Sequence, residues 1–317
     1  MSARPRTLLL TFDAFGTLFY PRPSVPEQYA SAAHHFGIPR SAVTPKKLET
    51  AFIPEYKAQA KARPNYGRDA VLRGEYGGPK QWWEEIIRAS FARAMTTTTQ
   101  TTTRLPDALI EHLLDRFASK EGYALYDDVE PFFAFMRALR AKKLEGSTVL
   151  GAFGRVVVGV ISNSDDRVPA VLRSLGLRVG RCRADEGVDS GLLPGFEHRN
   201  DRSPDAPARS DDPDDIDMVI TSYEAGEEKP SAHIFEVARR QAQRLLQCED
   251  VSSNSDDGIW TCMHVGDDYE KDYQAAINAG WAGYFIPRDN GDQAPGGARM
   301  IQTLIELIPK LELENHR

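Results

Sequence analysis

A short apolar run near the start of the chain, residues 8–12 (LLLTF), ends at a single carboxylate, Asp13. A run that is apolar on both faces is typical of a central strand in a parallel sheet, because helices cover such a sheet on both sides. Ligands of open α/β sheets bind beyond the carboxyl ends of the strands, so Asp13 is a candidate reacting group. The same pattern also fits an aspartate that only caps a turn or a helix after a buried strand.

Four further segments have the pattern of buried strands, and helical patterns separate them. The run 156–161 (VVVGVI) is rich in β-branched residues, as buried strands are. Strands that alternate with helices predict a parallel sheet with helices on both faces. We therefore expect an α/β fold with a doubly wound, Rossmann-like parallel sheet of five strands. The three remaining strands are expected at residues 218–221, 260–265 and 281–286.

A long segment without strand patterns, residues 21–124, separates the first expected strand from the second. Its apolar residues recur at helical spacing in four stretches, which predicts a helical bundle inserted into the core. The α/β core then consists of residues 1–20 and 125–317. Within the bundle, residues 96–103 (TTTTQTTT) have low complexity, so we expect a flexible loop without chemistry there.

A second insertion is expected inside the core, at residues 184–215. Acidic residues and prolines dominate this segment, and apolar residues are few. Such a composition is typical of segments that cannot bury enough apolar surface to fold. We therefore predict a disordered acidic insertion rather than a metal-binding acidic cluster.

Polar side chains follow four of the five expected strands. Because the carboxyl ends of parallel strands lie along one edge of a sheet, these side chains are expected to converge. Each residue taken alone also fits a helix cap or a solvated loop side chain. The set consists of Asp13, then Ser162 with Asn163, then Lys229, and finally Asp267, Asp268 and Asp272.

This set of side chains suits the transfer of a phosphoryl group. A carboxylate such as Asp13 can act as the nucleophile and form an aspartyl-phosphate. Mg²⁺, bound by carboxylates, neutralises the phosphate so that an anionic nucleophile can approach it. The ammonium of Lys229 and the hydroxyl of Ser162 are expected to bind further phosphate oxygens.

Four motifs, in this order and spacing, resemble the haloacid dehalogenase-like (HAD) hydrolase superfamily. They are DAFGTL at 13–18, ISNS at 161–164, KP at 229–230 and GDDYEKD at 266–272. The resemblance extends over nearly the whole chain. The sequence around these motifs, including LTFDAFGTL and HVGDDYEKDYQAA, is similar to sequences of the eukaryotic subgroup that contains the HAD-like hydrolase domain-containing protein 3. The resemblance implies a HAD core, and a helical cap domain in the place of the insertion.

The resemblance also implies a role for each matching residue. Asp13 would be the nucleophile, and Ser162 with Asn163 would bind a phosphate oxygen. Lys229 would contact both the phosphate and Asp13. Asp272 would be either a further metal ligand or a residue that supports the ligands from behind, and Asp268 fits either role. The implied ligands of Mg²⁺ are Asp13, the backbone carbonyl of Phe15, Asp267 and Asp272.

Phe15 departs from the pattern of the family's phosphatases, which carry a second aspartate at this position as general acid and base. Such help is worth about 10²–10⁴-fold, so we expect weak turnover of alkyl phosphates and better turnover of substrates with good leaving groups. Two other interpretations stay open. One is a metal-independent 2-haloacid dehalogenase, whose first motif has the same form. The other is a weakly catalytic protein that uses the fold for binding or regulation.

Composition excludes several classes of partner. With 39 Lys and Arg against 46 Asp and Glu, the net charge is −7 and no basic stripe suggests nucleic acid. The three cysteines lack paired spacing, which indicates a reducing compartment rather than disulfides or zinc. No apolar run is long enough to span a membrane. We expect a cytoplasmic protein, also nuclear, that acts on a small phosphorylated molecule; its oligomeric state is left open.

Overall fold

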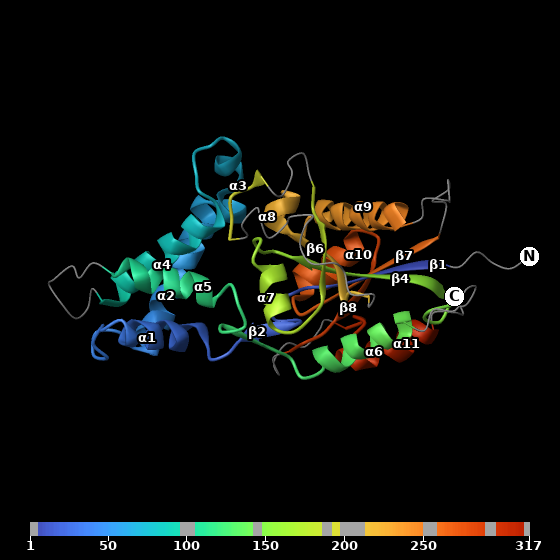
Figure 1. Cartoon of the computed structure of the whole chain (residues 1–317), viewed down its shortest axis with the longest axis horizontal. Coiled ribbons are helices and arrows are strands. Elements are labelled where there is room, and N and C mark those ends of the chain that lie inside the picture. Colours follow the sequence, from blue (N-terminus) through green and yellow to red (C-terminus); the bar gives the residue numbers. More distant parts are fainter. Residues whose placement is uncertain are drawn as a thin grey trace, which may run out of the picture.

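The computed structural model of the chain describes residues 6–95, 105–141, 148–185, 192–196, 213–249, 259–288 and 296–313. Its centre is a parallel sheet with the strand order β5-β6-β4-β1-β7-β8 (Figure 1). The predicted α/β fold with a doubly wound parallel sheet is therefore confirmed. The strands are β1 (Arg6–Phe12), β4 (Phe153–Ser162), β5 (Val179–Arg183), β6 (Ile216–Thr221), β7 (Trp260–Gly266) and β8 (Ala282–Phe285).

The sheet has six strands, so the expected number of five was wrong. The missing strand is β5, whose sequence VGRCR contains two arginines instead of an apolar run. β5 lies at one edge of the sheet and pairs only with β6, and Arg181 is exposed. Charged side chains are common on edge strands, because one side of such a strand faces solvent.

The strand β1 lies in the middle of the sheet and explains why the first apolar run is continuous. Leu8 and Leu10 belong to the apolar cluster on one face of the sheet, whereas Leu9 belongs to the cluster on the other face. All three side chains are fully buried. Asp13, the next residue after the strand, donates its backbone N–H to the carbonyl of Val265 at the end of β7 (2.9 Å). Asp13 is thereby fixed at the carboxyl edge of the sheet.

Helices cover both faces of this sheet. In Figure 1, α9 (Ala232–Glu249) lies above the strands, and α6 (Val129–Ala141) and α11 (Leu307–Leu313) lie below them. The short helix α10 (Ala275–Asn278) packs into the same apolar cluster as α9, and α7 (Val168–Ser174) into the cluster of α6. This arrangement leaves the carboxyl ends of the strands facing the inserted helices.

The helical insertion between the first two strands of the sheet is confirmed (Figure 1, left). It lies between β2 (Phe19–Pro21) and β3 (Tyr123–Leu125), which pair antiparallel and join it to the core. The predicted domain borders fall at this strand pair, and the division into a core and a cap domain stays a prediction. The helices are α1 (Val25–His35), α2 (Pro45–Ala62), α3 (Pro64–Leu72), α4 (Pro79–Met95) and α5 (Asp107–Arg116).

The described insertion therefore contains one helix more than the four expected. The extra helix, α3, begins at Pro64, immediately after the point where the sequence pattern only predicted the end of α2. Residues 65–67 have positive φ angles of 46°, 60° and 73°, so the chain bends sharply here. Sequence periodicity does not reveal a bend made by such a left-handed turn.

Two predicted loops lie largely outside the described residues. These are all of 96–103 and most of 184–215, of which 184–185, 192–196 and 213–215 are described. Asp215 is buried and accepts two hydrogen bonds from Arg137 Nη1 (2.8 and 3.0 Å), so this end of the predicted acidic insertion belongs to the core.

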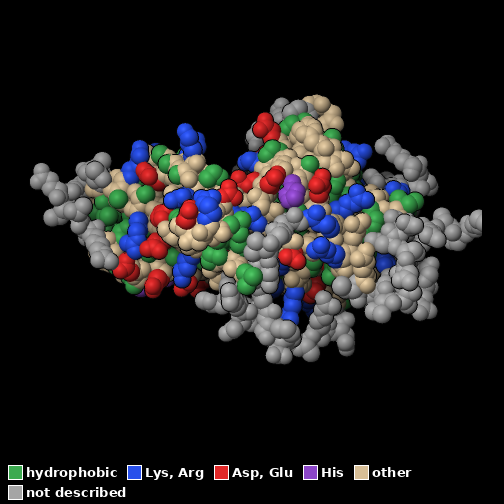
Figure 2. All heavy atoms as spheres, turned by 90° about the horizontal axis from the view of Figure 1, so that it is seen from above, with side chains coloured by type: hydrophobic (Ala, Val, Ile, Leu, Met, Phe, Trp, Pro, Cys, Tyr) green, Lys and Arg blue, Asp and Glu red, His purple; other side chains and the backbone are tan. Residues whose placement is uncertain are grey.

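The face of the molecule seen in Figure 2 has Lys and Arg side chains interspersed with Asp and Glu side chains over both the insertion and the core. This pattern agrees with the mixed charges of the sequence. Of the helices in the described part of the chain, none is long and apolar enough to cross a bilayer.

Candidate active site

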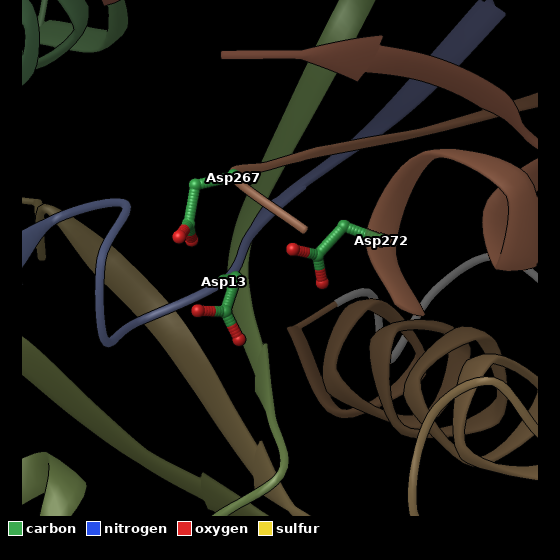
Figure 3. Close-up of side chains that lie close together, drawn as sticks. All are labelled: Asp13, Asp267 and Asp272. Carbon is green, nitrogen blue, oxygen red and sulfur yellow. The ribbon is translucent and has the colours of Figure 1, made fainter. Parts of the chain in front are cut away.

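Three carboxylates meet beyond the carboxyl ends of β1 and β7 (Figure 3). Asp13 follows β1, Asp267 follows β7, and Asp272 lies in the π-helical turn η3 (Tyr269–Gln274). One oxygen from each carboxylate lies within 4.8 Å of the others. Asp13 and Asp272 are buried, and Asp267 is half-buried. The structure thus brings together three residues that were predicted from the strand ends.

Lys229 lies between two of these carboxylates and is itself only 3% exposed. Its Nζ donates to Asp13 Oδ1 (2.6 Å), to Asp272 Oδ1 (2.6 Å) and to the backbone carbonyl of Ile161 in β4 (2.8 Å). Burial alone lowers the pKa of a lysine, but the attraction of the two carboxylates outweighs burial and raises the pKa of Lys229. The ammonium therefore stays charged at neutral pH.

The site contains more negative than positive charge. Burial raises the pKa of Asp13 to about 7; Lys229 opposes this shift, and the neighbouring Asp272 and Asp267 add to it. Burial also raises the pKa of Asp267. When all three carboxylates ionise around one ammonium, two negative charges remain uncompensated. Oxygen ligands with this excess charge fit a divalent cation such as Mg²⁺.

Asp272 uses both of its oxygens in contacts with protein groups. Oδ1 accepts from Lys229 and lies 3.3 Å from Nε2 of the buried His264, and Oδ2 accepts the backbone N–H of Asp268 (2.9 Å). Burial opposes ionisation, but Lys229 and His264 outweigh it and hold the pKa of Asp272 below its usual range. Of the two roles that the sequence left open, these contacts favour the support of Lys229 over metal ligation. The sequence did not point to His264.

The loop after β1 packs directly against Asp267. Thr17 Oγ1 donates to Asp267 Oδ1 (2.7 Å) and accepts the backbone N–H of the same residue (3.1 Å). Gly16 has a φ of +81°, and a Cβ on it would lie 2.3 Å from Asp267 Oδ2. Only glycine meets both requirements without strain. The sequence placed Gly16 and Thr17 in the first motif, but not as the support of a carboxylate 250 residues away.

Gly16→Ala is expected to weaken the binding of Mg²⁺ about 10–100-fold, as loss of a residue that orients a metal ligand usually does. The added methyl group would displace the Asp267 carboxylate. Calorimetric titration with Mg²⁺ measures the change. Gly37→Ala is the matched control, because Gly37 has a φ of +83° but no atom within 4 Å of the position of a Cβ. Equal Mg²⁺ affinity in the two variants would contradict the proposal that Asp267, held in place beside Gly16, binds the ion.

Ser162 and Asn163 lie at the end of β4, as predicted, and both line the cavity that contains Asp13. Ser162 is buried beside this cavity. Asn163 makes a two-point contact with the backbone of Lys229: its Nδ2 donates to the carbonyl (2.8 Å), and its Oδ1 accepts the N–H (2.6 Å). This contact positions Lys229. The direct binding of phosphate by Ser162 and Asn163 stays a prediction.

Asp268 has a different role from Asp267 and Asp272. Its Oδ1 accepts the backbone N–H groups of Glu270 (3.0 Å) and Lys271 (2.9 Å), and its Oδ2 pairs with Lys271 Nζ (3.0 Å). It thereby caps the turn that carries Asp272. The sequence left open whether Asp268 binds the metal or supports the ligands; its side chain is instead a cap, and its backbone N–H supports Asp272.

The carboxylates open into a cavity of about 370 Å³ between the core and the inserted helices. The core contributes its polar residues, and the insertion contributes mainly apolar and aromatic side chains. Phe15 also lines the cavity, and its ring packs edge-on against Tyr123 (5.5 Å between ring centres). A small organic molecule can therefore lie with one end at Asp13 and its body against aromatic rings.

Comparison with known proteins finds relatives that align with most of the chain. The chain is 27% identical to the haloacid dehalogenase-like hydrolase domain-containing protein 3 of Mus musculus, over 99% of this chain and 97% of that protein. It is 28% identical to an uncharacterized hydrolase of Schizosaccharomyces pombe, over 86% of this chain and 87% of that protein. The crystal structure of the HAD-hydrolase YfnB from Bacillus subtilis bound to magnesium is similar at 17% identity, with a TM-score of 0.47 over 98% of this chain and 100% of that chain.

The family model described as haloacid dehalogenase-like hydrolase matches residues 8–280, which include every residue of the site built above. The chain therefore belongs to the haloacid dehalogenase-like hydrolases.

Proposed function

We propose that the chain is a cytoplasmic, Mg²⁺-dependent phosphatase that acts on a small phosphorylated substrate through an aspartyl-phosphate on Asp13. The observation that carries the proposal is the position of Asp13: it lies 2.6 Å from the Lys229 ammonium, next to two more carboxylates, at one wall of a ligand-sized cavity. A nucleophile, a fixed cation and a set of metal ligands are the components that phosphoryl transfer needs.

The residues divide the chemistry among them. The ionised carboxylate of Asp13 attacks phosphorus, and the bond to the leaving oxygen breaks; water then attacks the aspartyl-phosphate and releases inorganic phosphate. The ammonium of Lys229 and the hydroxyl of Ser162 bind phosphate oxygens. Asp13, Asp267 and the backbone carbonyl of Phe15 hold Mg²⁺. When bound, the ion supplies the charge neutralisation that lets a carboxylate approach a phosphate.

Turnover should depend strongly on the leaving group, because Phe15 has no proton to give to the departing oxygen. We expect kcat/KM to fall about 10²–10⁴-fold from aryl to alkyl phosphates of similar size, which is the usual worth of a positioned acid. A series of substituted phenyl phosphates together with an alkyl phosphate measures this dependence. A flat series would mean that another group of the site protonates the leaving oxygen.

The test of the proposal is a phosphate-release assay with an aryl phosphate, run with Mg²⁺ and with a chelator, beside a halide-release assay with a 2-haloacid. Phosphate release that needs Mg²⁺ supports the phosphatase. Halide release without metal would reassign the chain to the dehalogenases, whose first motif it resembles. If the folded protein binds Mg²⁺ but shows neither activity, a role in binding or regulation is favoured.

A further inference from the structure

The cavity contains a second group of polar side chains, away from the carboxylates and within an otherwise apolar wall. Arg167 follows β4, Tyr29 lies on α1, and Tyr123 lies on β3. Their side chains are only 5%, 3% and 8% exposed, yet all three line the cavity. The roles proposed above for the phosphate end of the cavity do not use any of them.

Contacts on three sides hold the guanidinium of Arg167. Its Nε and Nη2 each donate to one oxygen of Asp165 (2.8 Å both), and Asp165 also accepts the indole N–H of Trp83 (2.8 Å). The guanidinium stacks on the rings of Trp83 and Phe196, at 4.8 and 4.5 Å from the ring centres. A third donor, Nη1, contacts the backbone carbonyl of Phe117 (3.4 Å). Since arginine has five N–H groups, two of them are left for another acceptor. The group is a rigid, preorganised donor.

The two tyrosine hydroxyls add to this donor set. Among the described residues, neither Tyr29 nor Tyr123 has a hydrogen-bond partner for its hydroxyl. Burial raises the pKa of Tyr29, and it raises the pKa of Tyr123 to about 12; Arg167 opposes both shifts, because the hydroxyls lie within its electrostatic reach. Both residues line the cavity, so an acceptor on a ligand can take the hydrogen bonds that these hydroxyls do not make within the protein.

A chain of ring contacts connects this group to the phosphate end of the cavity. Phe15, two residues after the nucleophile, packs on Tyr123 (5.5 Å); Tyr123 packs on Phe117 (5.8 Å), and Phe117 packs on Tyr29 (5.6 Å). The leaving group of a phosphate bound at Asp13 can therefore lie along these rings. Its far end would reach the donors of Arg167, Tyr29 and Tyr123.

We infer that the substrate is the phosphate monoester of an aromatic or similarly apolar alcohol that carries a carbonyl or carboxylate oxygen, and that Arg167, Tyr29 and Tyr123 bind this oxygen. The inference rests on the proposed phosphatase function and adds the substrate class to it. Asp165 neutralises Arg167, so a neutral carboxamide and a carboxylate are both acceptable ligands.

The first test compares kcat/KM for phenyl phosphate with that for carboxyphenyl and carbamoylphenyl phosphates, each as the para and the meta isomer. At least one acceptor-bearing substrate should be favoured about tenfold or more over phenyl phosphate. The Tyr29→Phe/Tyr123→Phe double variant should lose most of this preference, because only the donors of Arg167 then remain for the acceptor oxygen. Tyr20→Phe is the matched control, since Tyr20 lies on β2 and is not among the described residues that line the cavity.

The thermal stability of the ligand-free double variant gives a second readout. Because both hydroxyls face the cavity and make no hydrogen bond to the described protein, their removal should leave the melting temperature nearly unchanged. An undiminished preference for acceptor-bearing substrates in the double variant would overturn the inference, as would the absence of any preference in the unmodified protein. Phosphate release in either of these cases would leave the phosphatase proposal intact.

Binding of a non-phosphorylated probe separates the inference from catalysis. In the presence of a chelator, 4-hydroxybenzoate or 4-hydroxybenzamide should bind at least about tenfold more tightly than phenol, as measured by ligand-observed NMR titration. The double variant should lose most of this selectivity. If no phosphate ester is hydrolysed but this selectivity is found, the subsite stands and the phosphatase proposal fails. Equal binding of the three probes by the unmodified protein would overturn the proposal that Arg167, Tyr29 and Tyr123 bind an acceptor oxygen.

Discussion

Asp13→Asn should lower the kcat of Mg²⁺-dependent phosphate release from an aryl phosphate by at least about 10⁴-fold, since removal of the nucleophile of a serine protease costs about 10⁶-fold. The amide cannot form the aspartyl-phosphate, whereas its oxygen can still accept the hydrogen bond that Lys229 donates to Asp13 Oδ1. Asp115→Asn, an exposed change on α5, is the control and should leave kcat unchanged. Residual activity within about tenfold of the unmodified protein would exclude Asp13 as the nucleophile.

The same variant should be more stable than the unmodified protein at pH 8 in the absence of Mg²⁺. The pKa of Asp13 is raised from 3.8 to about 7, so the folded protein favours the protonated carboxyl. Its stability contribution is therefore complete below about pH 4 and is lost as the pH rises through 7. Asparagine is neutral throughout, so the difference in melting temperature should be small near pH 4 and should grow up to pH 8. A difference that is constant with pH would contradict the raised pKa.

Lys229→Met should be the most destabilising single change in the site, by about 3–5 kcal/mol near pH 8, because it leaves buried carboxylates without their counter-charge. Asp13 and Asp272 would then repel each other in a buried place. Activity should also fall about 10²–10³-fold, as when one fixed donor to a transition state is removed. Urea unfolding and the phosphate-release assay measure the two effects, with the exposed Lys46→Met on α2 as the control.

Acidification should reverse much of the instability of Lys229→Met. The pKa of Asp272 lies below its usual range because Lys229 and His264 outweigh the effect of burial. Without Lys229, burial dominates, the carboxyls take up protons at higher pH, and the repulsion disappears. The loss of unfolding free energy should therefore be smaller at pH 5 than at pH 8. An equal loss at both pH values would indicate that Lys229 contributes mainly packing.

The sequence was sufficient to predict the main strands and the residues at their ends. The run 8–12 is buried on both faces, and such runs have few alternatives to a central parallel strand. Because parallel strands end at one edge, Asp13, Lys229 and Asp267 could be expected to meet before any coordinates were known. The strand β5 was not predicted, because its two arginines interrupt the apolar pattern of a buried strand. The bend at the start of α3 was not predicted, because the positive φ angles at Asn65 and Tyr66 leave no periodic signal in the sequence.

The partners of individual side chains could not be predicted, because they depend on packing between distant segments. Thr17 contacts Asp267 across 250 residues of sequence, and Asn163 contacts Lys229 across 66. The sequence left open a metal ligand or a supporting residue for Asp268, whereas its hydrogen bonds show that its side chain caps η3. Likewise, the arginine after ISNSDD looks like an ordinary charged loop residue, whereas the structure buries it between two aromatic rings.

Chemical trapping of the phosphorylated enzyme tests directly whether Asp13 is the nucleophile. The protein is mixed with an aryl phosphate and Mg²⁺, quenched in acid within the first turnover, and digested for mass spectrometry. If Asp13 is the nucleophile, the peptide that contains it carries a phosphoryl group. This group should be absent when a chelator is added and absent in Asp13→Asn. Release of phosphate under the same conditions without any adduct at Asp13, or with the adduct on another residue, would contradict this role of Asp13.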